Sequence, residues 1–235
     1  SEALISFDME GMVMKAVPYG NGHINDTFLM TLRKDDGTEG RVILQGMNKK
    51  VFTQPVELME NVMGVTTFIR DKVIENGGDP ERESLNVIPT KDGKPYFMDS
   101  DGEYWRCYKY IENTTCYDQA ETPRDFYESA VAFGNFQRLL ADYPAETLHE
   151  TIKDFHNTKA RFAVFKQVVD ADVCGRAASV QKEIEFVLAR EEIANYFTDM
   201  LANGELPLRV THNDTKLNNI MMDNETGKGI CVIDL

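Results

Sequence analysis

The sequence predicts an α+β protein in which an antiparallel sheet with one inserted helix precedes a mostly helical half. Over residues 1–111, apolar and polar residues alternate between glycine-containing turns, as expected of half-buried strands. Over residues 122–235, apolar residues recur mainly every three or four positions, which indicates helices. A polar joint at 112–121 separates the two patterns. With 235 residues the chain suits one large or two small domains, and we expect two lobes.

The first half alternates strand patterns with turns and contains one helix pattern. The DG pair in "RKDDGTEG" predicts a hairpin turn between the second and third strands. The helix begins near Pro55 and ends at Asn76, where two glycines follow. The predicted strands cover 12–17, 26–32, 41–45, 85–90, 95–99 and 104–111.

The second half contains three helix patterns. The first, over 122–144, has Thr122 as its N-cap and Pro123 at the first helical position. The second spans about 155–171, and the third is a single helix over 178–204. The apolar segments after residue 219 predict a short hairpin with "NETGKG" as its turn.

Composition excludes several classes of function. A net charge of -14, spread along the chain, disfavours nucleic acid, because binding to a phosphate backbone needs clustered Lys and Arg. A small phosphorylated ligand is compatible with this charge, since a metal ion can hold it. The four cysteines form no CxxC pair, and the sequence has neither a signal-peptide pattern nor an apolar run long enough to span a membrane. We therefore expect a cytoplasmic protein without a membrane partner.

The stretch "VTHNDTKLNNIMMDNETGKGICVIDL" at 210–235 gathers the residues that carry chemistry. A loop at one end of the predicted hairpin would bring Asn219 and Asp234 together as oxygen ligands for Mg²⁺. Asp214 could accept the proton of a substrate hydroxyl, while Lys216 offsets charge on a phosphoryl group. A plain polar turn is the alternative, and the combined spacing with a second acid downstream disfavours it. His212 is expected to brace the loop through hydrogen bonds, and the histidine spacing predicts no zinc site.

These motifs resemble those of the aminoglycoside phosphotransferase and choline kinase superfamily. "HNDTKLNN" followed by "VIDL" is similar to its catalytic and metal-binding motifs, and this is the most specific part of the match. The stretches "GNGHINDTFLM", "VILQGMN", "VFTQPVELMENV" and "YKYIENTT" resemble N-acetylhexosamine 1-kinases. The resemblance implies a kinase-like two-lobed fold, ATP and Mg²⁺ as cofactors, and transfer of the γ-phosphoryl group to the anomeric hydroxyl of a sugar.

The same resemblance assigns further residues to the nucleotide site. It implies a phosphate-covering loop, a hinge that receives adenine, and an acid on the inserted helix, for which Glu60 is the first candidate and Glu57 the alternative. One position departs from the wider fold: Gln45 stands where a Lys or Arg is usual, and an amide brings no charge. Phosphate binding would then depend on Mg²⁺, loop amides or a neighbour such as Lys49. The implied loop, strand and hinge residues are Gly20, Gly22, His23, Asn25, Thr27, Gln45, Tyr110, Ile111 and Glu112.

Two alternatives to a sugar kinase stay open at this stage. One is a kinase for another small alcohol, such as an aminoglycoside, choline or homoserine; the other is a nucleotide-binding module without catalysis. The resemblance also implies a long helical part after the metal-binding Asp234, which would supply much of the acceptor pocket and makes the chain a truncated form. The sequence specifies neither the acceptor nor the oligomeric state.

Overall fold

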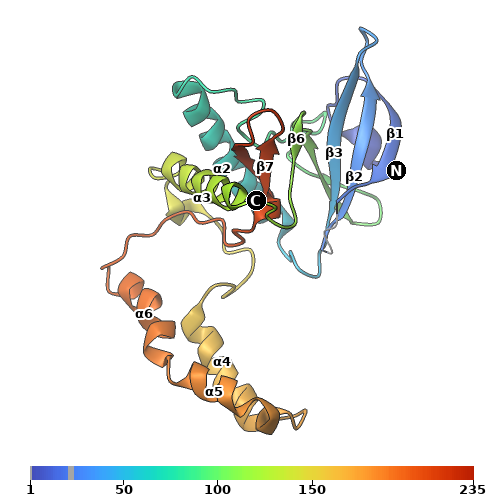
Figure 1. Ribbon diagram of the computed structural model, residues 1–235. Coiled ribbons are helices and arrows are strands. Elements are labelled where there is room, and N and C mark those ends of the chain that lie inside the picture. Colours follow the sequence, from blue (N-terminus) through green and yellow to red (C-terminus); the bar gives the residue numbers. More distant parts are fainter. Residues whose placement is uncertain (1, 21–23) are drawn as a thin grey trace. The chain divides into compact units, whose positions relative to one another are not determined.

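The computed structural model describes residues 2–20 and 24–235, and it confirms the α+β class (Figure 1). Two compact units can be distinguished: Ser1–Thr151 with Val210–Leu235, and Ile152–Arg209. The lobe boundary predicted at 112–121 falls inside the first unit and stays a prediction. None of the helices in the described part of the chain combines the length and apolar character needed to cross a membrane.

A five-stranded antiparallel sheet forms the first part of unit 1, in the order β1-β2-β3-β5-β4. Its strand β2 pairs with β3 in the predicted hairpin, and β3 pairs with β5. Register places Thr27 opposite Gln45, and Gln45 opposite Arg106, so these side chains form one row across three strands. The strands are β1 (Met12–Pro18), β2 (Asp26–Arg33), β3 (Glu39–Met47), β4 (Phe97–Met98) and β5 (Tyr104–Lys109).

The helix α2 (Pro55–Glu75) matches the prediction and packs one face on this sheet. Its residues Leu58, Met59 and Val62 form a buried cluster with Met47 and Tyr108 of the sheet. A short helix, α1 (Ala3–Ser6), lies beside the other apolar cluster of the sheet, which includes Met30, Leu44 and Cys107. The sheet is thus buried on both faces, which requires its polar row to be matched by hydrogen bonds.

A second, three-stranded sheet follows the order β6-β7-β8 and lies next to the loop at 212–219. It consists of β6 (Thr114–Thr115), β7 (Ile220–Asp223) and β8 (Gly229–Val232). The helix α3 (Pro123–Leu139) packs against this sheet and against α2, with Phe136, Ile220 and Met222 in the shared core (Figure 1). Thr122 is its N-cap as predicted, and Asp125 accepts the backbone N–H of Thr122 at 2.8 Å.

The helices of unit 2 are α4 (Thr158–Ala171), α5 (Gln181–Leu188) and α6 (Glu191–Ala202). The single helix predicted over 178–204 is therefore wrong. The helix α5 ends at Leu188, and α6 begins at Glu191. Glu191 and Glu192 lie in the first turn of α6, where acidic side chains stabilise a helix N-terminus. The restart lets α6 lie beside α4, with Lys159 bound to Asp199 at 2.6 Å.

The regular strand predicted at 85–90 is also absent from the described structure. The segment makes only isolated bridges, Phe7 with Thr90 and Val87 with Tyr108. Pro89 explains the interruption because its nitrogen carries no hydrogen for a ladder bond. Short 3-10 turns complete the chain at Ala145–Thr147, Ala177–Val180 and Leu217–Asn219.

Candidate active site

His212 braces the loop that precedes β7. Its Nε2 donates to the carbonyl oxygen of Ile233 at 2.8 Å, and its Nδ1 accepts the backbone N–H of Asp214 at 3.3 Å. These two contacts require the neutral tautomer with hydrogen on Nε2. Phe133 and Phe136 of α3 meet the imidazole edge to face. His212 therefore fixes Asp214 relative to β8, in the structural role that the sequence predicts.

Asp214 is the carboxylate around which the loop is organised. Lys216 Nζ lies 2.8 Å from Asp214 Oδ2, and Asn219 Nδ2 donates to the same oxygen at 3.1 Å. Asn219 Nδ2 also donates to the backbone carbonyl of Asp214 at 2.9 Å. The hydrogen bond from Lys216 is the largest of the effects that lower the pKa of Asp214, so this side chain is a carboxylate at neutral pH. Its Oδ1 accepts from no described residue and is available to a substrate hydroxyl.

Asn219 and Asp234 lie on neighbouring strand ends. Asn219 is buried and directly precedes β7, whereas Asp234 is exposed and follows β8 by two residues. The backbone N–H of Ile233 donates to the carbonyl of Asn219 at 2.9 Å, which extends the β7–β8 pairing to the position before Asp234. Asp234 has φ of 65°, a left-handed conformation that Asp tolerates better than most residues. The hairpin thus brings these two oxygen donors to one end.

The donor set suits a hard cation better than zinc. No group of three or more His, Cys, Asp or Glu side chains with metal-binding geometry occurs in the described part of the chain. Two oxygen ligands from the protein are typical of Mg²⁺ sites, where water and phosphate oxygens complete the octahedron. Asn219 has its amide nitrogen bound to Asp214, so its side-chain oxygen is the atom left for a cation.

The row of side chains across β2, β3 and β5 contains a residue that the sequence analysis missed, Arg106. Gln45 Nε2 donates to Thr27 Oγ1 at 3.0 Å, and Arg106 Nε donates to Gln45 Oε1 at 2.8 Å. Arg106 is 2% exposed, and its Nη1 donates to the carbonyl of Leu235 at 3.3 Å. The signal was present as an arginine inside the aromatic strand "YWRCYKY", on the face shared with Tyr108. The row links the expected nucleotide strands to the segment that carries Asp234.

The β1–β2 turn holds the residues predicted to cover phosphates. Gly20 has φ of 80° with open space around its Cα, so a glycine is required by conformation and not by packing. Asn25 Oδ1 accepts the backbone N–H of Asn48 at 3.0 Å, which ties the turn to the end of β3. Gly22 and His23 lie outside the described residues.

The segment predicted as the hinge follows β5 and is held by side-chain contacts. Arg41 forms an ion pair with Glu112 and stacks over the ring of Tyr110, with 4.2 Å from the guanidinium carbon to the ring centroid. Ile111 is buried, and its carbonyl accepts the hydroxyl of Thr114 at 2.7 Å. The backbone N–H of Tyr110 donates to the carbonyl of Arg41 at 3.3 Å, so the carbonyl of Tyr110 and the backbone groups of Glu112 are the candidates for contacts with adenine.

Two other candidates from the sequence, Glu60 and Lys49, make their contacts away from the row of Thr27, Gln45 and Arg106. Glu60 of α2 lies at the surface and contacts His149 Nε2 at 2.7 Å. Lys49 contacts Glu103 at 2.8 Å and the carbonyl of Gly102 at 2.9 Å. In their place, the face of α2 toward the sheet carries Met59 and Val62, and the cation nearest to Gln45 among the described residues is Arg106.

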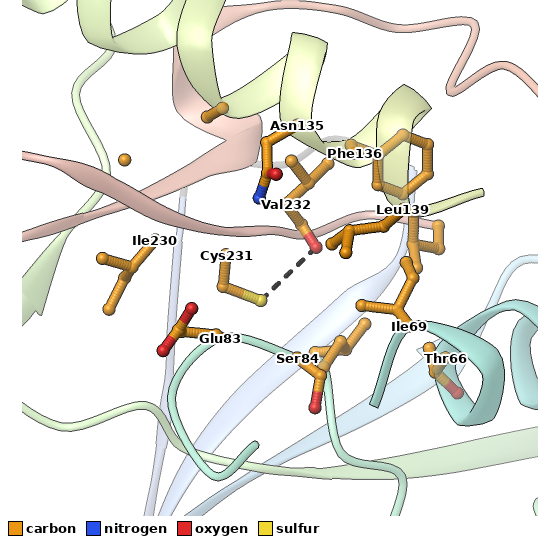
Figure 2. A pocket seen from close by; sticks show the side chains of 14 residues that line it. Thr66, Ile69, Glu83, Ser84, Asn135, Phe136, Leu139, Ile230, Cys231 and Val232 are labelled. Atoms are coloured by element: carbon orange, nitrogen blue, oxygen red, sulfur yellow. Dashed lines mark hydrogen bonds between the residues drawn. The ribbon is translucent and has the colours of Figure 1, made fainter. Parts of the chain in front are cut away.

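A small cavity within unit 1 lies apart from these residues (Figure 2). It has a volume of about 30 Å³ and lies between α2, α3 and β8, lined by Thr66, Asn135 and Cys231 among others. This volume accommodates no more than one or two water molecules. Burial raises the pKa of the Cys231 thiol to about 12, which makes it unreactive. The cavity is therefore a feature of core packing and not a substrate pocket.

Comparisons with known proteins bear on the family and on the fold of this chain. A model of the phosphotransferase enzyme family, APH, matches residues 16–235. The structure of an aminoglycoside phosphotransferase from Alicyclobacillus acidocaldarius is similar with a TM-score of 0.55 and 12% identity, over 99% of this chain and 64% of its own. Amicoumacin kinase hAmiN, solved with AMP-PNP, Ca²⁺ and Ami, gives a TM-score of 0.54 and 11% identity, over 99% of this chain and 61% of its own.

This chain spans about three fifths of the length of those two structures, and at such identities the likeness concerns the fold. The family model, in contrast, covers nearly the whole chain and includes the loop with Asp214, Asn219 and Asp234. The chain belongs to the phosphotransferase enzyme family.

Proposed function

We propose that the protein transfers the γ-phosphoryl group of ATP to a hydroxyl of a small molecule. The observation that carries this proposal is the arrangement around Asp214: Lys216 and Asn219 both bind its Oδ2, and Asn219 is joined through Ile233 to the segment of Asp234. A carboxylate, a cation and two metal-binding oxygens are the protein groups that phosphoryl transfer requires.

The site residues divide the tasks of the proposed reaction. Asp214 orients the acceptor hydroxyl through Oδ1 and takes its proton as the bond from that oxygen to the γ-phosphorus forms, while the bond from the γ-phosphorus to the bridging oxygen breaks and ADP leaves. Lys216 offsets negative charge on the transferred group. Asn219 holds Asp214 through its amide nitrogen and, with Asp234, would hold Mg²⁺. When bound, the ion neutralises charge on the phosphate oxygens.

Two buried polar atoms support a polar ligand at this place. Asn218 Oδ1 has no hydrogen-bond partner among the described residues, and the Tyr108 hydroxyl makes no hydrogen bond of ordinary length there, although Arg106 is close enough to oppose, as a donor, the rise that burial causes in the pKa of that hydroxyl. Asn218 adjoins the metal ligand Asn219, and Asp234 is close enough to Tyr108 to contribute to raising its pKa, an effect that is mainly due to burial. Such atoms are rare in folded proteins and favour a ligand or ordered water.

For the acceptor, we propose the anomeric hydroxyl of an N-acetylhexosamine. The support is the resemblance of five separate stretches, from "GNGHINDTFLM" to "THNDTKLNN", to N-acetylhexosamine 1-kinases. A second candidate is another small alcohol such as an aminoglycoside, favoured by the similarity to an aminoglycoside phosphotransferase and to amicoumacin kinase.

The test is an ADP-release assay on the complete protein with ATP, Mg²⁺ and a panel of acceptors. Turnover with N-acetylhexosamines and release of the sugar 1-phosphate would support the first candidate. Turnover limited to aminoglycosides, choline or homoserine would support the second. ATP binding by calorimetry without turnover on any acceptor would instead indicate a nucleotide-binding module.

A further inference from the structure

Arg106 is a buried cation without an acidic partner. Its residue is 2% exposed, and no ion pair joins it to a carboxylate anywhere in the described part of the chain. Burying a guanidinium removes it from water at a large cost in free energy, so such groups are normally paired with an acid. Arg41, on the neighbouring strand β3, does have an acidic partner, Glu112.

Hydrogen bonds to one side chain and one backbone oxygen satisfy only part of the guanidinium. Nε donates to Gln45 Oε1 at 2.8 Å and Nη1 donates to the carbonyl of Leu235 at 3.3 Å. Its carbon lies 5.3 Å from the centre of the Tyr108 ring, at the outer range of a cation–π contact. A guanidinium carries five N–H donors, and Nη2 makes no hydrogen bond of ordinary length to a described residue, although Arg106 is close enough to the Tyr108 hydroxyl to oppose, as a donor, the rise that burial causes in the pKa of that hydroxyl. The positive charge of Arg106 is therefore not neutralised by an acidic side chain, and some of its N–H donors remain for a ligand.

The position of this charge is tied to the proposed nucleotide site from two sides. Through Gln45, Arg106 is connected to Thr27, which starts β2 just after the turn that contains Gly20. Through Leu235, it is connected to the residue next to Asp234. A guanidinium between a glycine turn and a metal-binding acid is well placed to meet phosphate oxygens.

We infer that Arg106 supplies, from strand β5, the positive charge that binds the triphosphate of the nucleotide, with Gln45 holding its guanidinium in position. This inference rests on the proposed function, because it requires a nucleotide to bind at this site. The protein then distinguishes nucleotides by the charge of their phosphates through Arg106, and the neutral Gln45 on β3 serves as its positioning residue.

The experiment measures binding of ATP and of adenosine by calorimetry, with Mg²⁺, in the complete protein. The compared quantity is the ratio of the two affinities, which reports on phosphate binding separately from adenine binding. The variants are Arg106→Gln, Arg106→Lys, and Arg106→Gln combined with Gln45→Lys, which returns a cation to the row from the neighbouring strand. Arg33→Gln, an exposed arginine on β2, is the matched control.

Arg106→Gln should lower the ratio by about tenfold or more, since a charge-assisted hydrogen bond is lost, while adenosine affinity is kept. The added Gln45→Lys should restore the ratio to within about threefold of the wild type, and Arg33→Gln should leave it unchanged. A purely structural role would change both affinities together, or neither.

A folded Arg106→Gln protein with an unchanged ratio overturns the inference. Where Arg106→Gln does not fold, the combined variant takes its place, because it keeps one cation in the row. A ratio within about threefold of that of the wild type then supports the inference, and a ratio reduced about tenfold overturns it. If the wild type binds no ATP, the proposed function itself fails. If it binds ATP and Arg106 has no effect on the ratio, only this inference fails.

Discussion

The carbonyl of Asn219 accepts the backbone N–H of Ile233 at 2.9 Å, so one hydrogen bond aligns the ends of β7 and β8. This bond places the two proposed metal ligands, Asn219 and Asp234, at the same end of a two-stranded ribbon. His212 adds a second link to the carbonyl of Ile233 at 2.8 Å. The proposed catalytic loop and the proposed metal ligand Asp234 are thus held by contacts that do not involve the carboxylates of Asp214 and Asp234, and Asp234→Asn should change metal binding with little change in fold.

Asp214→Asn should abolish transfer and spare nucleotide binding. The amide has nearly the same shape but cannot take a proton, so kcat should fall by about 100-fold to 10,000-fold. The affinity for ATP, measured by calorimetry, should stay within about threefold of the wild type because Asp214 faces the acceptor. Glu205→Gln, an exposed change of equal charge, is the control. Full turnover of the Asp214→Asn protein would exclude Asp214 as the base.

Asp234→Asn should raise the Mg²⁺ concentration needed for half-maximal nucleotide binding by about tenfold or more, because an anionic ligand is replaced by a neutral one. The readout is the affinity for ATP as a function of Mg²⁺, which does not depend on turnover. Glu225→Gln, in the turn at the other end of the β7–β8 hairpin, also removes one negative charge and should leave the Mg²⁺ dependence unchanged. An unaltered Mg²⁺ dependence in Asp234→Asn would rule out Asp234 as a ligand.

Glu81 should give the protein a stability that depends on pH. It binds Lys109 of β5 at 2.7 Å and Arg70 of α2 at 2.9 Å, and the hydrogen bond from Lys109 is the largest effect that lowers its pKa. A carboxyl with a lowered pKa in the folded state stabilises the fold above its unfolded pKa, near 4.5, and loses this contribution as the pH falls through the folded value.

The contribution is limited to about 1 kcal/mol, since all three side chains are partly exposed to solvent. Urea unfolding at pH 7 and at pH 3 should show a larger loss of stability in the wild type than in Glu81→Gln. Glu205→Gln should behave as the wild type does. Equal losses in the wild type and in Glu81→Gln would contradict the role of this ion-pair network.

Local patterns predicted much of this fold. Pro55 and Thr122 marked the starts of α2 and α3, and the alternating apolar residues gave β2, β3 and β5. These features are encoded over a few residues, by capping groups and by side-chain period. The predictions failed where a continuous apolar pattern contains an interruption. Pro89 has no N–H for pairing along β5, and the helical pattern over 178–204 did not show that α6 separates from α5 to lie beside the distant α4.

The candidate site was likewise predicted where its residues are close in sequence, and missed where they are far apart. Asp214, Lys216 and Asn219 lie within one short loop, so their spacing alone brought them together, and the structure places them in contact. Arg106 was missed because its partners are Gln45, 61 residues away, and Leu235, 129 residues away. A strand pattern indicates which face a side chain occupies but not which strand lies beside it.

Gly229→Ala should test how closely β8 must approach α3 for the site to form. A Cβ at Gly229 would lie 2.8 Å from the Ala132 Cβ and 3.2 Å from the carbonyl oxygen of Glu128, so the strand would have to move. Overpacking of this kind costs about 1–3 kcal/mol. Gly134→Ala is the matched control on α3: no atom lies within 4 Å of its added Cβ, and Ala should stabilise the helix by about 0.5–1 kcal/mol. Urea unfolding should therefore give opposite signs for the two substitutions, and stabilisation by Gly229→Ala would contradict the close packing of β8, the strand that leads to Asp234.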